Sequence, residues 1–308
     1  MLTVLIGCRV AHDHDNLIKM WLPISEKISE TTGRHFAINH QQPIGGGCIN
    51  AAYCINGNGQ QYFVKTNAAA GAAMFEAEAA GLEEIAHSRS VRVPKPICHG
   101  TTGNTSFLVL EYIELGGSRH GSLAELGCQL ARMHRTTSNH YGWRRDNTIG
   151  STPQINTQSD NWVEFWRNRR LRFQLELAAR NGYRGSLQRH GERLLSDIEI
   201  FFERYTPPAS LLHGDLWSGN YDVTRNGEPV IFDPAVYYGD RETDLAMTEL
   251  FGGFSPQFYQ AYENEYPLDN GYSERKILYN LYHVLNHLNL FGGGYLSQAE
   301  RMMESLLH

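Results

Sequence analysis

The stretch Leu211-Leu-His-Gly-Asp-Leu-Trp-Ser-Gly-Asn220 contains the pattern on which the fold assignment depends. An apolar pair runs into His-Gly-Asp, and Asn220 follows Asp215 after five residues. Asp233 comes thirteen residues after Asn220, beyond a polar turn and a short apolar run that reads as a strand. Because short strands and turns connect these three side chains, we treat them as one candidate site.

The three side chains match the requirements of phosphoryl transfer. One carboxylate orients the attacking hydroxyl and accepts its proton, while an amide oxygen and a second carboxylate hold Mg²⁺ on the phosphates. Asp215 is the predicted base, and Asn220 and Asp233 are the predicted metal ligands, since Mg²⁺ prefers hard oxygen ligands. Protein-kinase catalytic loops use the same interval between Asp and Asn, which favours this interpretation over three unrelated turn residues.

The residues around the candidate site differ from those of protein kinases. Leu216-Trp217 follows the predicted base where protein kinases usually have Leu-Lys, and Pro234-Ala235 replaces Phe-Gly after Asp233. The segment from Asp233 to Asp244 is too short for a phosphorylated activation loop. These departures favour small-molecule kinases of the same fold, such as aminoglycoside and choline kinases, which share the His-Gly-Asp form.

A lysine in the first half of the chain completes this chemistry. Lys65 lies in the apolar strand Tyr62-Phe-Val-Lys-Thr66, where an unpaired charge would be costly. A predicted helix follows over 68–87, and in this fold a helix glutamate clamps the strand lysine that aligns the α- and β-phosphates. Glu78 is the predicted partner because apolar neighbours bracket it on a face expected to turn inward. Glu76 remains an alternative, since helix phase is uncertain from sequence.

Two further segments are predicted to bind the nucleotide. Gly45, Gly46 and Gly47 precede Lys65 between two predicted strands, and such a loop can fold its backbone amides over phosphates. It is not a Walker loop, because no Gly-Lys-Ser/Thr follows. Where the buried strand of residues 107–113 ends, the backbone of Glu111 and Ile113 is predicted to hydrogen-bond adenine in an apolar slot.

The order of the predicted elements indicates an α+β, bilobal protein-kinase-like fold. Residues 20–113 are predicted to form an ATP-binding N-lobe, a small antiparallel sheet with one helix. The pattern changes from strands to helices near Gly116-Gly117, so residues 114–308 are predicted to form a mainly helical C-lobe with the catalytic loop and substrate site. Residues 1–19 differ in character from the rest of the chain, which predicts a disordered leader.

Composition and charge narrow the possible partners. The net charge of −6 argues against nucleic acid, whose binders usually carry a basic stripe. No apolar run approaches the roughly 18–20 residues that span a bilayer, so no membrane partner is expected. The cysteines lack a Cys-x-x-Cys pair, which predicts a reducing cytoplasm rather than a disulfide framework. They are Cys8, Cys48, Cys54, Cys98 and Cys128.

The sequence resembles the fructosamine kinases, also called ketosamine-3-kinases, from about Met20 to its end. The matching stretches are Gly46-Gly-Cys-Ile-Asn50, Phe63-Val-Lys65, Met74-Phe-Glu-Ala-Glu-Ala79, Leu211–Asn220, Phe232-Asp-Pro-Ala235, Tyr238-Gly-Asp-Arg-Glu-Thr-Asp-Leu-Ala246 and Leu281-Tyr-His-Val-Leu-Asn-His-Leu-Asn-Leu-Phe-Gly292. The resemblance implies transfer of the ATP γ-phosphate, with Mg²⁺, to the 3-hydroxyl of a ketosamine, either a small molecule or a glycated protein lysine. The phosphorylated adduct then decomposes and frees the amine, which implies a deglycation repair role.

The resemblance also implies roles for residues outside the catalytic trio. Asp244 should be the buried carboxylate that hydrogen-bonds the catalytic-loop backbone. The block Trp143–Trp162, with Gln154 and Asn156, is similar to the family's insertion beside the substrate. Trp217 could stack on the sugar, since an aromatic face suits the C–H side of a hexose or pentose.

Two other residues have competing interpretations. Cys48 is similar to a redox-sensitive position of the family, with simple packing against the glycine loop as the alternative. His283 and His287 lie one helical turn apart, but no third ligand is evident in the sequence. Substrate contact or packing is therefore predicted for His287 rather than metal binding.

Two rival functions are compatible with the same residues. Another small-molecule kinase is the nearer rival, because the negative net charge could recruit a polycationic aminoglycoside, and choline is a further possible acceptor. A non-catalytic pseudokinase that serves as a binding module is disfavoured. Such modules usually lack one of the four key residues, Lys65, Asp215, Asn220 and Asp233. The chain is expected to be a monomer or a homodimer.

Overall fold

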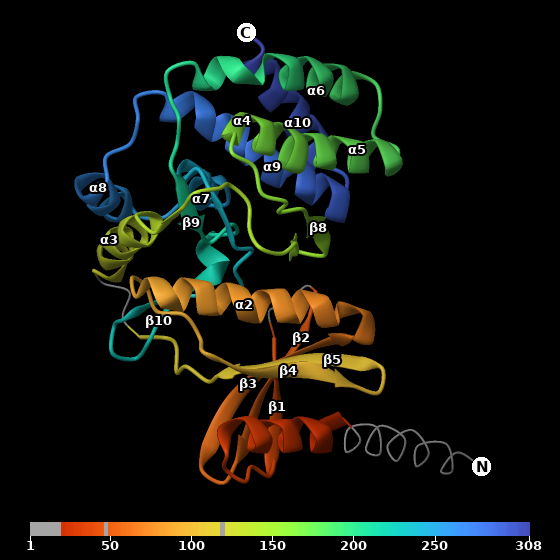
Figure 1. The fold of residues 1–308 in the computed structure, drawn as a ribbon, viewed down its shortest axis with the longest axis vertical. Helices are drawn as coiled ribbons and strands as arrows, with labels where there is room; N and C mark the ends of the chain where they lie inside the picture. The colour runs from red at the N-terminus through yellow and green to blue at the C-terminus, as the bar shows by residue number, and fades with distance from the viewer. Residues whose placement is uncertain (1–19, 46–48, 118–120) are drawn as a thin grey trace. The chain divides into compact units, whose positions relative to one another are not determined.

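The chain folds into two compact units (Figure 1). The computed structural model describes residues 20–45, 49–117 and 121–308. Of the described residues, those up to Glu83 and Pro94–Ile113 form the first unit, and Glu84–Val93 and those from Glu114 to His308 form the second. The predicted leader, residues 1–19, lies outside the described residues, as do Gly46, Gly47 and Cys48.

A five-stranded antiparallel sheet forms the centre of the first unit. Its strands are β1 (His40–Ile44), β2 (Ala51–Gly57), β3 (Gln60–Ala68), β4 (Pro96–Thr102) and β5 (Thr105–Glu111), in the order β1-β2-β3-β5-β4. Asn58 and Gly59 join β2 to β3, and both have positive φ angles, as a two-residue type I′ hairpin turn requires. This tight connection fixes the register that pairs Lys65 of β3 with Ala52 of β2.

Apolar side chains from one helix cover this sheet. The helix over residues 20–32 presents Trp21, Ile24 and Ile28 to a cluster formed with strand residues such as Ile55 and Val64. Their spacing of three and four residues places them on one helical face, so burial of that face holds the helix to the sheet. Downstream of β3 come a 3₁₀ turn (Ala69–Gly71) and the helix α2 (Ala72–Ser88).

The second unit is mainly helical (Figure 1). Its helices include α3 (Ser122–His134), α4 (Trp162–Phe165), α5 (Arg172–Arg180), α6 (Ser186–Asp197), α7 (Glu242–Leu250), α8 (Pro256–Glu265), α9 (Tyr272–Phe291) and α10 (Tyr295–Leu306). A π-helical segment (Trp166–Leu171) joins α4 to α5, and a 3₁₀ helix (Ile198–Phe202) follows α6. Most of α9 is buried, and it contacts α5, α7 and α10. This helix is therefore the core element of the unit.

The second unit also contains short strands, which flank its loops. They are β6 (Thr137–Ser138), β7 (Asn147–Ile149), β8 (Thr152–Gln154), β9 (Ala209–Leu212), β10 (Tyr221–Val223), β11 (Pro229–Ile231) and β12 (Tyr237–Gly239). The central strand of a three-stranded sheet is β9, which lies between β12 and β6, whereas β10 pairs with β11 and β7 with β8. All these pairs are antiparallel.

A buried ion pair links two helices of the second unit. Arg275 of α9 donates from Nε and Nη2 to the two carboxylate oxygens of Glu242 of α7, at 2.7 and 3.0 Å. Both side chains are almost fully buried, and Arg275 also donates to Asp269 at 2.6 Å. Across residues 20–45, 49–117 and 121–308, no helix has the length and apolarity needed to cross a membrane.

Candidate active site

The predicted catalytic loop, residues 213–220, connects β9 to β10 in the second unit. The buried strand β9 ends at Leu212. Its place in the core fixes the start of the loop that contains His213, Gly214 and Asp215. Tyr221 of β10 lies opposite Ile231 of β11. The hairpin thus brings Asn220 and Phe232 together, and the Phe232 amide donates to the Asn220 carbonyl at 3.1 Å. Asn220, and Asp233 just after Phe232, therefore lie at the same end of the hairpin.

Glycine is required at position 214 of this loop. Its φ of +82° lies in the left-handed region, and a Cβ there would approach Ala235 O to 2.1 Å. The Ala235 amide in turn donates to His213 O at 2.8 Å. The loop that contains Asp215 thus packs backbone to backbone against the segment that follows Asp233.

Asp215 and Asn220 are in direct contact. The Asn220 side-chain nitrogen donates to the Asp215 carbonyl at 2.9 Å and to Asp215 Oδ2 at 3.3 Å. Burial raises the pKa of Asp215 to about 7, and the charge of Asp233 adds to the rise, while the Asn220 hydrogen bond opposes it. A carboxyl group with a pKa near neutrality is suited to general base catalysis at neutral pH.

Asp244 forms hydrogen bonds with the backbone of this loop. This α7 residue is 1% exposed, and its two carboxylate oxygens accept from the amides of His213 (2.7 Å) and Gly214 (2.8 Å). Burial by itself would raise the pKa of Asp244, but the hydrogen bond from His134 and those loop amides outweigh it and lower the pKa. Asp244 is therefore an ionised anchor for the residues that precede Asp215.

His134 of α3 extends this anchor through a chain of hydrogen bonds. Burial lowers the pKa of His134, so the ring is neutral. Its Nε2 lies 3.1 Å from Asp244 Oδ2, and its Nδ1 lies 2.7 Å from the Tyr262 hydroxyl. Because Arg241 donates to that hydroxyl at 3.0 Å, Tyr262 donates to Nδ1 and the ring proton faces Asp244. No motif in the sequence pointed to His134, because it lies 110 positions from Asp244.

The residues of this loop fit a divalent cation. Asp233 has a φ of +59°, a left-handed conformation that Asp tolerates better than most residues with a side chain. The nitrogen of the Asn220 amide is engaged by Asp215, so its oxygen is the atom suited to a metal. A cation at Asp233 and Asn220 would also relieve the repulsion that raises the pKa of Asp215.

The first unit contains the lysine–glutamate pair. Lys65 Nζ of β3 lies 2.6 Å from Glu78 Oε1 of α2, and the side chains are 7% and 10% exposed. Of the two glutamates considered from the sequence, Glu78 makes this ion pair, whereas Glu76 is exposed on the same helix. Glu78 thus gives the buried Lys65 side chain a carboxylate partner that compensates its burial.

Other predicted nucleotide contacts are described only in part. Gly45 is exposed, and nothing would obstruct a Cβ there; Gly46 and Gly47 lie outside the described residues. The Glu111 amide at the end of β5 donates to Lys95 O at 2.8 Å. The adenine contacts proposed for Glu111 and Ile113 stay predictions.

Comparison with known proteins identifies the family. The model of the fructosamine kinase family matches residues 20–308. The chain belongs to the fructosamine kinase family. A probable ketoamine kinase of Synechocystis is 49% identical over 93% of this chain and 97% of its own length. A chloroplastic protein-ribulosamine 3-kinase of Arabidopsis thaliana is 46% identical over 92% and 87% of the two chains. The resemblance stated from the sequence motifs is thereby confirmed.

Solved structures confirm the α+β, kinase-like fold. A candidate fructosamine-3-kinase of Haemophilus somnus superimposes with a TM-score of 0.88, at 30% identity, covering 95% of this chain and 99% of that one. The aminoglycoside phosphotransferase APH(4)-Ia, in a complex with ADP and hygromycin B, gives a TM-score of 0.64 at 13% identity, covering 92% and 97%. The second likeness extends the shared fold to small-molecule kinases outside the family.

In this fructosamine kinase family member, Trp217 and His287 lie near the catalytic loop. The Trp217 ring covers Gly219, where a Cβ would come within 2.2 Å of it, and meets Phe251 edge-on. His287 Nδ1 donates to His283 O at 2.8 Å, and its ring packs against Phe251 with centroids 4.7 Å apart. Both of these predicted substrate residues therefore contact the same phenylalanine.

Gln154, also predicted as a substrate residue, lies inside the second unit. It is 1% exposed, and its side-chain nitrogen donates to Asn147 Oδ1 (2.8 Å) and Ala235 O (3.0 Å). Its oxygen accepts from the Tyr282 hydroxyl at 2.8 Å. Gln154 thus supports the backbone beyond Asp233, because Ala235 also bonds to the catalytic loop.

The block Trp143–Trp162, which we call the insertion, is held by a buried arginine. Arg170 donates to Ile155 O and Asn156 Oδ1, each at 2.7 Å, and its guanidinium lies 4.2 Å from the ring centre of Tyr237. Cation–π contact and carbonyl oxygens stabilise the buried charge, which lies between the insertion and β12. Since charged residues are rarely buried without special partners, the sequence pattern alone did not indicate this role.

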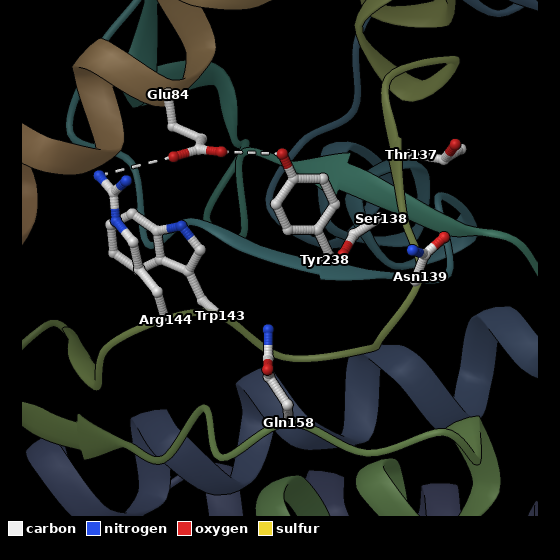
Figure 2. A pocket seen from close by; sticks show the side chains of 8 residues that line it. All are labelled: Glu84, Thr137, Ser138, Asn139, Trp143, Arg144, Gln158 and Tyr238. Atoms are coloured by element: carbon white, nitrogen blue, oxygen red, sulfur yellow. Dashed lines mark hydrogen bonds and ion pairs between the residues drawn. The ribbon is translucent and has the colours of Figure 1, made fainter.

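A polar cavity of about 370 Å³ lies in the second unit, and Figure 2 shows the side chains that line it. The lining residues are Glu84, Thr137, Ser138, Asn139, Trp143, Arg144, Gln158 and Tyr238. Glu84 accepts from the Tyr238 hydroxyl at 2.8 Å and pairs with Arg144 at 3.7 Å. Tyr238 lies opposite Leu211 in the sheet, so the cavity is at the part of β9 that precedes the catalytic loop.

Proposed function

We propose that the chain transfers the γ-phosphate of ATP to the 3-hydroxyl of a ketosamine. The observation that carries the proposal is the grouping of Asp215, Asn220 and Asp233 on loops anchored by Asp244. Membership of the fructosamine kinase family and the names of the ketoamine and ribulosamine kinases among its relatives support this acceptor class.

Asp215 is the proposed general base. Its raised pKa allows it to take the proton of the acceptor hydroxyl at neutral pH as the phosphoryl group is transferred. Asn220 and Asp233 would hold Mg²⁺, which supplies charge neutralisation on the phosphates. Lys65, fixed by Glu78, would orient the α- and β-phosphates of the nucleotide.

The acceptor sugar is proposed to lie beside Trp217. An exposed indole two residues after the base suits the C–H face of a pentose or hexose, and His287 follows on the same aromatic cluster. Phosphorylation at the 3-hydroxyl would make the adduct decompose and release the amine. The proposed role is therefore deglycation of small molecules or of protein lysines; the cytoplasmic location stays a prediction.

A side-by-side assay tests the proposal. Ribulosamine-lysine and fructosamine-lysine would be incubated with ATP and Mg²⁺, and ADP release and the sugar phosphate would be measured. We expect phosphate on the 3-hydroxyl of at least one of them and loss of transfer in Asp215→Asn. Transfer to an aminoglycoside or choline, with none to either ketosamine, would favour the rival acceptor class. Absence of ATP consumption with every acceptor would favour a binding module.

A further inference from the structure

Five aromatic side chains form a continuous strip in the second unit, which we call the aromatic strip. Trp217 meets Phe251 at 6.5 Å between ring centroids, and Phe251 meets His287 at 4.7 Å. His287 then contacts Phe291 at 5.5 Å and Tyr295 at 5.2 Å. The strip joins the catalytic loop, the end of α7, the end of α9 and the start of α10.

Both ends of the aromatic strip reach the surface. Trp217 is 38% exposed and Phe291 is 59% exposed, although most large apolar side chains of the described residues are buried. Contiguous exposed aromatic groups are uncommon on soluble proteins unless they bind something, because their burial in a complex is favourable. The α9 spacing of His287 and Phe291, four residues apart, aligns the two rings on one face.

The aromatic strip is uncharged at neutral pH. Burial lowers the pKa of His287, and its Nδ1–H is already donated to His283 O. Trp217, Phe251 and Phe291 have no ionisable group. A partner of matching chemistry is apolar or aromatic, since a charged group would lose hydration against these rings without gaining a counter-charge.

The position of the aromatic strip defines which part of the acceptor can reach it. The strip begins two residues after Asp215, the proposed base. In a ketosamine the amine is on carbon 1, two carbons from the 3-hydroxyl, so its substituent starts close to the reacting group. His213, Gly214 and Leu216 are buried, whereas Trp217 is exposed. With that hydroxyl at Asp215, the amine side of the acceptor therefore has room to extend on the Trp217 side of the base.

With the sugar beside Trp217, we propose that the rest of the aromatic strip binds the amine side of the acceptor, namely apolar residues that flank a glycated lysine in a peptide. The inference rests on the proposed ketosamine kinase function and adds a preference for the carrier of the sugar. Phe291, at the outer end of the strip, then contributes to the choice of carrier but not to phosphoryl transfer.

The test uses two peptides with the same ribulosamine-lysine, one flanked by Phe and Leu and the other by Gly and Ser. We expect the wild-type chain to have a kcat/KM about fivefold or more higher for the apolar peptide, through a lower KM. Phe291→Ala should remove the preference by raising KM for the apolar peptide. The kcat for both peptides and the kcat/KM for the polar peptide should stay at wild-type values. Ile200→Ala, at another exposed apolar residue, is the matched control and should keep the preference.

Each outcome separates the inference from the function on which it rests. Equal wild-type kcat/KM for the two peptides, or a preference that survives in Phe291→Ala, would overturn the inference while leaving a ketosamine kinase. No transfer to either peptide or to free ribulosamine-lysine would instead reject the function, and the inference with it. A melting temperature for Phe291→Ala equal to wild type would show that a changed KM does not come from misfolding.

Discussion

Asp215, the proposed general base, is partly buried beside another carboxylate. Its pKa of about 7 in the folded chain exceeds the ordinary value of 3.8, so the folded state binds the proton more tightly than the unfolded state. The bound proton makes its whole contribution to the stability of the fold below about pH 4. This contribution is lost as the pH rises through about 7. The carboxylate that the reaction needs is therefore the form that destabilises the fold.

We predict that Asp215→Asn melts several degrees above the wild-type chain at pH 8, measured in EDTA by differential scanning calorimetry. The amide cannot ionise, so it avoids the repulsion from Asp233. The difference in melting temperature should grow from about pH 4 to pH 7 and then stay constant. Asp197→Asn, at an exposed carboxylate, is the control with little change. A lower melting temperature than wild type at pH 8 would contradict the assignment.

At this scale the sequence predicted some side-chain contacts but not others. The ion pair of Lys65 with Glu78 followed from a helix face, since neighbouring apolar residues indicate which side turns inward. The burial of Gln154 could not be read in the same way. The family resemblance of the block around it implied a place beside the substrate, and the structure shows both amide atoms in internal hydrogen bonds.

At the scale of elements, the pair between Arg275 and Glu242 links α9 to α7, which carries Asp244. We predict that Arg275→Met lowers the free energy of unfolding by about 3–5 kcal/mol, because it leaves Glu242 buried without its counter-charge. Lys276→Met is the matched control. Lys276 pairs with Glu249 in a partly exposed position, so its loss should cost about 1 kcal/mol or less. Urea titration measures both, and equal losses would refute the prediction.

Residues 162–180 show a helix that a regular period of 3.6 residues does not describe. The structure instead has α4, a π-helical segment and α5 in succession. The π turn carries Arg170, which is buried beneath aromatic rings, although an arginine is normally expected on the solvent face. The hairpin β2–β3 was predictable because Asn58-Gly59 supplies a specific turn, whereas strands of two or three residues such as β6 leave no pattern.

At the scale of the whole molecule, the residues of the proposed reaction are divided between the two units. The Lys65–Glu78 pair belongs to the first, and Asp215, Asn220 and Asp233 belong to the second. We predict that Lys65→Met lowers kcat/KM for ATP by about 100-fold or more, measured by coupled ADP release at saturating ketosamine. Lys27→Met, at an exposed lysine of the first unit, should retain wild-type kinetics. Near-normal turnover in Lys65→Met would contradict the proposed phosphate contact.

Family and fold were predictable at this scale because they depend on short motifs with fixed spacing, above all His213 to Asn220. Contacts between distant positions were not. The hydrogen bond of His134 to Asp244 spans 110 positions, and that of Glu84 to Tyr238 spans 154. A single sequence has no local signal for such pairs, since they arise only when the elements pack.

The close approach of Gly214 to Ala235 O limits how this chain can change by mutation. Every single-nucleotide change of a glycine codon that replaces the amino acid introduces a residue with a Cβ, and position 214 has no space for one. A single-nucleotide substitution in this codon is therefore tolerated only when the new codon also encodes glycine. Ketosamine kinases that diverge from this chain should vary in the cavity lining or the aromatic strip long before they vary at this residue.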